Sequence, residues 1–203
     1  MSAIIQRRLG ETDFSATWRA MQRFTAARDA ATQDELWLTA HPPVFTQGQG
    51  GRPEHLLRDI GIPVVKIDRG GQITYHGPGQ AVAYLLVDLA RRGLKVRELV
   101  SRIEQAVIDL LAGYGLRGER VAGAPGVYVD GAKIAALGLR VKGGCCYHGV
   151  ALNVDMELAP FAAINPCGYP GLKVTQLVDL GVKRDWAAAG EDLLAQLNRQ
   201  IEK

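Results

Sequence analysis

Three closely spaced apolar segments in the second half of the chain restrict its fold more than any other feature. They cover residues 126–129, 132–141 and 146–154, and only short turns separate them. The first turn is Asp130-Gly131, a pair that strongly favours a two-residue hairpin loop, and the second is Lys142-Gly143-Gly144. Strands joined in this way run antiparallel. The segments therefore predict a β-meander and exclude a purely parallel sheet.

Helices are predicted at the start, in the middle and at the end of the chain. Apolar residues recur at helical spacing near residues 13–30, from 96 to about 113, and from about 185 to 201. We interpret the first stripe, which includes Phe14, Trp18 and Met21, as core packing without a chemical role. Short strands are expected near residues 3–8, 35–39 and 44–47. The pattern predicts one α+β domain over residues 1–203, with a mixed, mostly antiparallel sheet flanked by helices.

The composition is that of an ordinary globular protein. Of the 203 residues, 47% are hydrophobic and 22% are charged, and the net charge is +3. This mild positive charge does not indicate nucleic acid, but it is compatible with an acidic protein partner. We expect no membrane segment and no signal peptide, because the apolar runs are short and the first residues lack the required order. Three cysteines do not suggest a disulfide framework, so we expect a cytoplasmic protein with at least one free thiol.

A glycine-rich stretch at residues 69–80 lies between two apolar segments, residues 63–67 and 81–87. Its four glycines allow the backbone to approach a ligand closely. We predict a loop held between two strands that forms one wall of a binding pocket. Phosphate is not expected there, because the stretch lacks both the P-loop and the dinucleotide-binding fingerprints.

Cys167 is the first candidate for chemistry. It lies between Pro166 and Gly168, in a segment whose constrained backbone could direct a reachable thiol. A reactive thiol also needs a lowered pKa, which a nearby cation or hydrogen-bond donor can supply. The alternative is that Cys167 is a small buried hydrophobe, which is the commoner role of a free cysteine.

Lys133 is the second candidate, because it lies in an otherwise apolar strand next to the hairpin turn. Strand alternation places it on the same face as Ala135, Leu137 and Leu139. The side chain either extends from the strand end to water or lies in a pocket, where it meets an anion or a thiolate. Small neighbouring residues favour the second alternative.

The remaining histidines and cysteines do not predict a metal site. Cys145, Cys146 and His148 are close in sequence, but their spacing does not match the usual paired-ligand motifs. His76 is a candidate acid–base group by residue type. A lone histidine in a polar loop is, however, more often only hydrogen-bonded.

Several segments together resemble the lipoyl(octanoyl) transferases, which belong to the biotin/lipoate protein ligase superfamily. They follow the order of the family across residues 41 to 177. The matching segments are residues 41–46, 69–80, 126–127, 133–140, 148–154 and 165–168. The main departure is at residues 142–146, where the turn and the residue before Tyr147 vary.

The resemblance implies a fold akin to the catalytic domain of biotin and lipoate protein ligases. It implies an acyltransferase that takes octanoyl from octanoyl-acyl carrier protein and holds it as a thioester. The acceptor is a specific lysine on a lipoyl domain of a 2-oxoacid dehydrogenase or on the glycine-cleavage H protein, and the transfer is the first step of endogenous protein lipoylation. No cofactor is implied. Cys167 matches the nucleophile, and Lys133 matches the lysine that activates it.

Residues that match the substrate-binding positions of the family lie in three parts of the chain. They are Arg69, Gly70, Gly71, Gln72, Ile73, Thr74, Tyr75, His76, Ala136, Leu137, Gly138, Gly149, Val150 and Ala151. We expect them to bury the octanoyl chain, with His76 as a candidate polar contact at the reacting end.

Three other functions are compatible with the sequence. An ATP-dependent lipoate or biotin ligase would use the same fold, but it would form an acyl-adenylate without a cysteine intermediate. An amidotransferase would move octanoyl between lipoyl-bearing proteins. A non-catalytic acyl-binding module would bind octanoate without turnover.

Overall fold

A mixed seven-stranded sheet forms the centre of the protein, as seen in a computed structural model that describes residues 3–166 and 171–203. The strand order is β1-β2-β6-β10-β9-β8-β7. The first two strands pair in parallel, and all the other neighbours in this sheet pair antiparallel. The strands are β1 (Ile5–Glu11), β2 (Glu35–Ala40), β6 (Gln80–Asp88), β7 (Glu119–Val121), β8 (Ala124–Val129), β9 (Ala132–Lys142) and β10 (Cys145–Asn153). The mostly antiparallel α+β architecture predicted from the sequence is confirmed.

The predicted meander is formed by β8, β9 and β10. Its first turn contains Asp130 at φ 49° and Gly131 at φ 77°, and the second contains Gly143 at φ 57° and Gly144 at φ 79°. Two consecutive residues with positive φ are typical of the tight hairpin turns that match strand twist. Local turn chemistry therefore determines how these strands pair.

A second, three-stranded sheet lies below the first and corrects the prediction for residues 69–80. Its order is β4-β3-β5, formed by β3 (Val44–Gln47), β4 (Val64–Lys66) and β5 (Ile73–His76). The glycine-rich stretch is thus not entirely a loop, because its centre is a buried strand. The side chains of β5 alternate: Ile73 and Tyr75 pack into an apolar cluster, and Thr74 and His76 line a cavity that Ile73 also borders. Glycine and polar residues concealed this alternation in the sequence.

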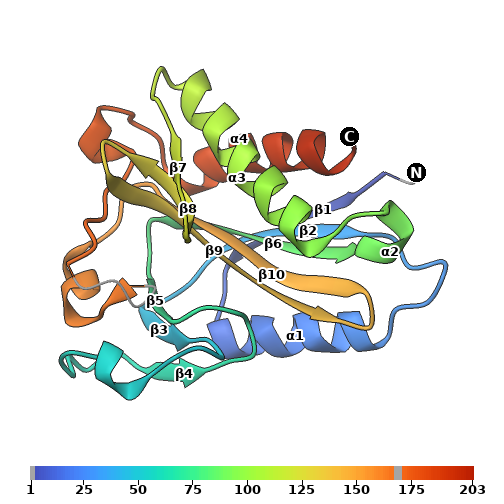
Figure 1. Ribbon diagram of the computed structural model, residues 1–203, viewed down its shortest axis with the longest axis horizontal. Coiled ribbons are helices and arrows are strands. Elements are labelled where there is room, and N and C mark those ends of the chain that lie inside the picture. The colour runs from blue at the N-terminus through green and yellow to red at the C-terminus, as the bar shows by residue number, and fades with distance from the viewer. Residues whose placement is uncertain (1–2, 167–170) are drawn as a thin grey trace.

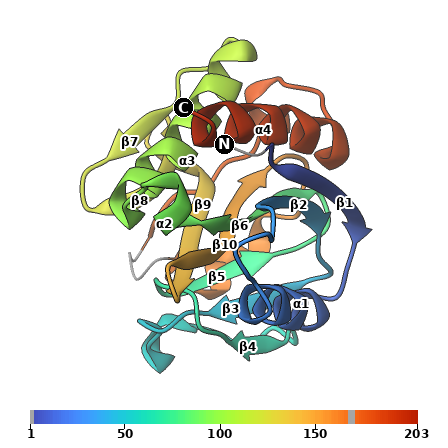
Figure 2. The same ribbon diagram turned by 90° about the vertical axis from the view of Figure 1, so that its right-hand side faces the viewer.

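Helices cover the large sheet unequally (Figures 1 and 2). On one face lie α3 (Val96–Gly113) and α4 (Trp186–Ile201), which form the main hydrophobic cluster with the sheet. On the other face lie α1 (Phe14–Ala26) and the small sheet. Both α1 and α4 begin after an aspartate cap, because Asp13 accepts a bond from Ala16 N and Asp185 accepts one from Ala188 N.

Short helical segments complete the described chain. They are η1 (Pro53–His55), α2 (Leu89–Arg92), η2 (Ala159–Ala163) and η4 (Val178–Leu180). Among the described residues, no helix is both long enough and apolar enough to cross a bilayer.

Candidate active site

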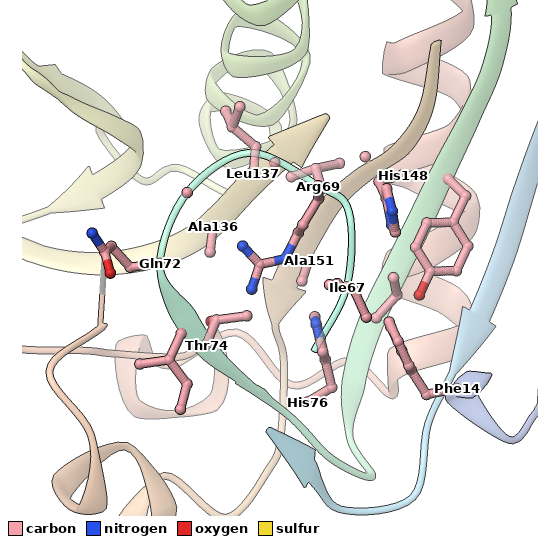
Figure 3. A pocket seen from close by; sticks show the side chains of 17 residues that line it. Phe14, Ile67, Arg69, Gln72, Thr74, His76, Ala136, Leu137, His148 and Ala151 are labelled. Atoms are coloured by element: carbon pink, nitrogen blue, oxygen red, sulfur yellow. The ribbon is translucent and has the colours of Figure 1, made fainter. Parts of the chain in front are cut away.

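A cavity lies between the two sheets, and Phe14 at the start of α1 lines one side of it (Figure 3). Its lining is mainly apolar, although several buried polar side chains reach it. The residues that line it are Phe14, Ile67, Arg69, Gly71, Gln72, Ile73, Thr74, His76, Val82, Tyr84, Ala136, Leu137, Gly138, His148, Gly149, Val150 and Ala151. Ligand sites in proteins are commonly concave and mostly apolar, with a few placed polar groups. The cavity is therefore the candidate active site.

Small residues on β9 and β10 leave room for this cavity. Ala136 on β9 pairs with Ala151 on β10, and Ala151 pairs with Val82 on β6. The neighbouring row runs in the same order through Gly138, Gly149 and Tyr84. The floor thus changes from small side chains on β9 and β10 to larger ones on β6.

A β-bulge in β9 directs Lys133 towards the cavity side. Val127 pairs with Ala135 and Tyr128 pairs with Lys133, so Ile134 is an extra residue between the two pairs. A bulge of this kind interrupts the alternation of side chains along a strand. Ile134 and Ala135 consequently both pack in the helix-covered core, while Lys133 lines a recess together with Ala136. The predicted common face with Ala135, Leu137 and Leu139 is therefore wrong.

Lys133 is 3% exposed, so it does not extend to water. Its Nζ donates a hydrogen bond to Pro125 O at 3.0 Å and lies 5.2 Å from the centre of the Tyr128 ring. Gly126 makes this approach possible, since a Cβ there would lie 3.2 Å from Lys133 Cε and 2.6 Å from Ala135 O. Gly126 also has φ 130°, which disfavours any other residue.

The recess that contains Lys133 adjoins the cavity. Thr74 and Ala136 line both spaces, and Pro166 lines the recess. The chain from Lys173 to Thr175 runs beside Lys133 and is bonded to its backbone on both sides, by Lys133 N to Lys173 O and by Thr175 N to Lys133 O. Cys167, the predicted nucleophile, follows Pro166 in the sequence and lies outside the described residues.

Arg69 forms a polar wall of the cavity. Its guanidinium donates to Thr46 O at 2.6 Å, to Thr46 Oγ1 at 2.9 Å and to Gly70 O at 2.9 Å. Its aliphatic stem passes over β9, where a Cβ on Gly138 would lie 3.0 Å from Arg69 Cδ. The bonds to the small sheet and the close contact with β9 hold the glycine-rich segment over the cavity.

Asp68, next to Arg69, connects this segment to α1 and β10. It accepts bonds from Trp18 Nε1 at 2.9 Å, from Gln22 Nε2 at 3.0 Å and from the Tyr147 hydroxyl. His148 Nε2 lies 3.0 Å from Asp68 Oδ1. Although burial opposes ionisation, the bonds from His148 and Tyr147 hold the pKa of Asp68 well below its usual value.

His148 reaches the cavity because its backbone is left-handed, with φ 65°. Its neighbour Tyr147 faces the cavity side by ordinary alternation, as Ala151 does. A regular strand would turn His148 towards the helices instead. The side chains of Tyr147 and His148 are therefore on one side, with ring centres 5.1 Å apart.

Aromatic and imidazole rings close the end of the cavity near α1. His41 Nδ1 donates to Thr12 O at 2.7 Å, which leaves Nε2 to accept from the Tyr84 hydroxyl at 2.7 Å. His76 Nδ1 donates to Gln80 Oε1 at 2.7 Å. Burial lowers the pKa of His76 to about 3, so this imidazole is neutral near pH 7.

Most of the predicted substrate-binding residues line the cavity, although Gly70 and Tyr75 do not. Gly70 N bonds to Leu139 O at 2.9 Å and joins the segment to β9. The Tyr75 ring packs away from the cavity, 5.6 Å from Phe45 and 5.4 Å from Phe161. His76 lies on the side of Phe14 rather than in the recess of Lys133, with ring centres 5.8 Å apart.

Sequence reasoning missed several residues of the lining, including Phe14, Ile67, Val82, Tyr84 and His148. Phe14 belongs to an apolar helical stripe, and Tyr84 lies in an apolar strand, so both resemble ordinary core residues. The cysteines close to His148 do not join it. Cys145 and Cys146 are buried free thiols, and Cys146 Sγ donates to Leu85 O at 3.4 Å. Within the described part of the chain, no group of three potential ligands could hold a metal ion.

Comparisons with known proteins show the family to which the chain belongs. The family described as the lipoyl protein ligase A/B catalytic domain matches residues 13–198. An octanoyltransferase of Aromatoleum aromaticum is 68% identical over 199 residues, which cover 98% of this chain and 86% of that relative. The chain belongs to the octanoyltransferases of this family.

Solved structures of a lipoate-protein ligase and a biotin protein ligase share the fold. A lipoate-protein ligase A bound with ATP has a TM-score of 0.81 at 14% identity, covering 99% of this chain and 86% of the other. A biotin protein ligase from Aquifex aeolicus has a TM-score of 0.57 at 10% identity, covering 100% of this chain and 70% of the other. The expected likeness to biotin and lipoate protein ligases is therefore confirmed at the level of fold.

Proposed function

We propose that this octanoyltransferase moves the octanoyl group of octanoyl-acyl carrier protein onto a specific lysine of a lipoyl domain, through a thioester on Cys167. The acceptors would be lipoyl domains of 2-oxoacid dehydrogenases and the glycine-cleavage H protein, in the cytoplasm. One observation carries the proposal: an apolar cavity adjoins a recess that is lined by both a buried lysine and Pro166, the residue before Cys167.

The cavity suits the hydrocarbon part of the substrate. Ala136, Ala151 and Val82 offer an apolar floor, and each CH₂ that leaves water contributes about 0.8 kcal/mol to binding. Polar groups at the cavity wall, such as those of His76 and Tyr84, already bond to protein atoms, as do the donors of Arg69 towards Thr46. The space between them therefore favours an aliphatic chain over a charged ligand.

In the first half-reaction, the Cys167 thiolate attacks the carbonyl carbon of the octanoyl thioester. A carbon–sulfur bond to Cys167 forms, the bond to the carrier's phosphopantetheine sulfur breaks, and the released thiolate takes a proton. In the second, the neutral amine of the acceptor lysine attacks the acyl-Cys167 thioester. An amide bond forms, the Cys167 sulfur leaves as a thiolate, and the amine loses a proton.

Lys133 is the proposed partner in both steps. As an ammonium, it would favour the thiolate form of Cys167 and supply the proton to the leaving pantetheine thiol. As a neutral amine, it would accept the proton of the attacking lysine. Thioester exchange is nearly balanced, and thioester-to-amide transfer is favourable, so the proposal requires neither a nucleotide nor another cofactor.

The intact mass of the protein tests the proposal most directly. After incubation with octanoyl-acyl carrier protein and no ATP, we expect the mass of one octanoyl group to be added, and peptide mapping should place it on Cys167. Cys167→Ser cannot form the thioester, so this variant should no longer transfer octanoyl to the lipoyl domain at the normal rate. Cys145→Ser, a matched control at a buried cysteine of β10, should retain both the adduct and the transfer.

Each alternative function predicts a different result. A ligase would require ATP and leave no acyl group on Cys167. An amidotransferase would prefer an octanoylated H protein to the acyl carrier protein as donor. Normal transfer by Cys167→Ser would contradict the proposed mechanism.

A further inference from the structure

We propose that Phe14 closes the end of the cavity opposite Lys133 and thereby sets the longest acyl chain that the enzyme accepts. This inference rests on the proposed function, because it assigns the cavity to the acyl chain. Phe14 is the first residue of α1, and it is the residue through which that helix lines the cavity. Figure 3 shows its ring beside Ile67, on the far side of His76 from Thr74.

The pairing of strands gives the cavity a direction. Thr74 and Ala136 belong to both the cavity and the recess of Lys133, so they mark the reacting end. From Ala136 the floor crosses to Ala151 and then to Val82. Three neighbouring strands span roughly 10 Å, which is similar to the length of an extended octanoyl chain. An acyl group attached near Lys133 would therefore direct its last carbons towards Val82, Tyr84 and Phe14.

The Phe14 ring is held firmly at this end. It is 3% exposed, its centre lies 5.3 Å from the His41 ring in an edge-to-face contact, and it stacks on His76 at 5.8 Å. Asp13 caps the helix one residue earlier through its bond to Ala16 N. Thr12 is also fixed, since its carbonyl accepts the bond from His41. A ring supported from the backbone and from two sides cannot easily move to admit further carbons.

Phe14 is also the part of this end wall that can be shortened with the fewest other consequences. Tyr84 and His41 bond to each other, and His76 bonds to Gln80, so replacing any of them would leave a buried polar group without its partner. Phe14 makes only apolar and ring contacts at the cavity. Its truncation should enlarge the end of the cavity while the polar contacts remain.

The test compares Phe14→Leu and Phe14→Ala with Phe24→Leu and Phe24→Ala. Phe24 lies in the same helix, but its ring packs on Trp37 at 5.9 Å. Transfer from hexanoyl-, octanoyl-, decanoyl- and dodecanoyl-acyl carrier protein to a lipoyl domain is measured as kcat/KM. Each additional buried CH₂ favours binding by roughly fourfold. We therefore expect the decanoyl-to-octanoyl ratio to rise about tenfold or more in the Phe14 variants and to stay unchanged in the Phe24 variants.

Val82→Leu tests the same end wall in the opposite direction. It adds one methylene from β6, so the hexanoyl-to-octanoyl ratio should rise. The chain-length profile separates a specificity role from general damage, because a damaged fold would lower transfer of all chains alike. An unchanged profile in folded Phe14 variants together with an unchanged profile in Val82→Leu would overturn the inference and leave the proposed function intact.

Failure of the proposed function gives a different result. If the unaltered protein transfers no octanoyl group from any carrier, the cavity can still be tested by calorimetric titration with free octanoate, decanoate and dodecanoate. Tighter binding of the longer acids by the Phe14 variants alone would support the assignment of Phe14. Equal binding by the unaltered protein and by these variants would contradict it.

Discussion

The two faces of the large sheet are built from the same strands but follow different rules. On the face covered by α3 and α4, side chains alternate regularly. Leu36 and Leu38 of β2, and Leu85 and Val87 of β6, all join one apolar cluster with the two helices. On the opposite face, the strands contribute small residues and rings to the cavity, and buried polar side chains lie among them.

Two departures from the regular strand pattern place polar side chains on the cavity face. The bulge at Ile134 places Lys133 in the recess, and the left-handed backbone of His148 turns its ring towards Asp68. The helix-covered face gains stability from uniform packing. The cavity face instead departs from the strand pattern where a polar side chain is required, as is common for bulges near functional sites.

Replacing Lys133 by Met should show most clearly that the cavity face serves activity and the helix-covered face serves stability. The variant keeps an apolar stem but removes the amine that we assign to proton transfer, a role that typically accelerates a reaction by about 10²- to 10⁴-fold. We expect octanoyl transfer to fall by that factor, whereas the thermal midpoint should change little. Lys142→Met, at the exposed end of the same strand, is the control and should transfer octanoate normally. Equal loss of activity in both variants would remove Lys133 from the mechanism.

Leu193→Ala on α4 should have the opposite effect. Leu193 is completely buried in the cluster beneath the helices, and such a truncation usually costs about 2–5 kcal/mol of unfolding free energy. Denaturant unfolding should show this loss. Below the unfolding transition, kcat and the chain-length profile should match those of the unaltered protein. A changed chain-length profile would mean that the two faces are coupled.

The cavity face should also make stability depend on pH. Burial lowers the pKa of His41, His76 and His148 in the folded protein, that of His76 to about 3. Between about pH 6.5 and pH 5, the unfolded chain binds protons that the folded chain does not. The free energy of unfolding therefore decreases as the pH is lowered through this range. For His76, this contribution is up to about 1.4 kcal/mol per pH unit.

His76→Gln tests that pH dependence. The variant should unfold with a shallower slope of free energy against pH than the unaltered protein, when both are measured by urea denaturation. Parallel curves for the two proteins would contradict the assignment of this pH dependence to His76.

The order of elements and the hairpins could be predicted because their signals are local. Asp130-Gly131 specifies a tight turn by residue type alone, and helical stripes are visible at their own spacing. The residues of the candidate site are harder to predict from the sequence, because they come together through long-range strand pairing. The small sheet that carries Thr74 and His76 depends on the pairing of β5 with β3, and no local pattern indicates it.

The errors have physical causes as well. The sequence of β9 alone indicates regular alternation and therefore predicts the wrong face of the strand for the Lys133 side chain. The bulge that shifts this side chain depends on the pairing of two strands. The sequence predicts Phe14 as a core residue, because a ring that lines an apolar cavity is as apolar as one that fills a core. The predicted substrate-binding residues follow from the resemblance to a family rather than from a local pattern.

The backbone bonds between Lys133 and the chain at Lys173 and Thr175 have a consequence for the order of assembly. On the ribosome, the lysine is made well before the segment that fixes it, and contacts between distant parts of a chain form late because the intervening loop must close first. A nascent chain thus carries the lysine without its final surroundings. The surroundings of Lys133 on which the proposed mechanism depends are therefore complete only after these long-range contacts have formed.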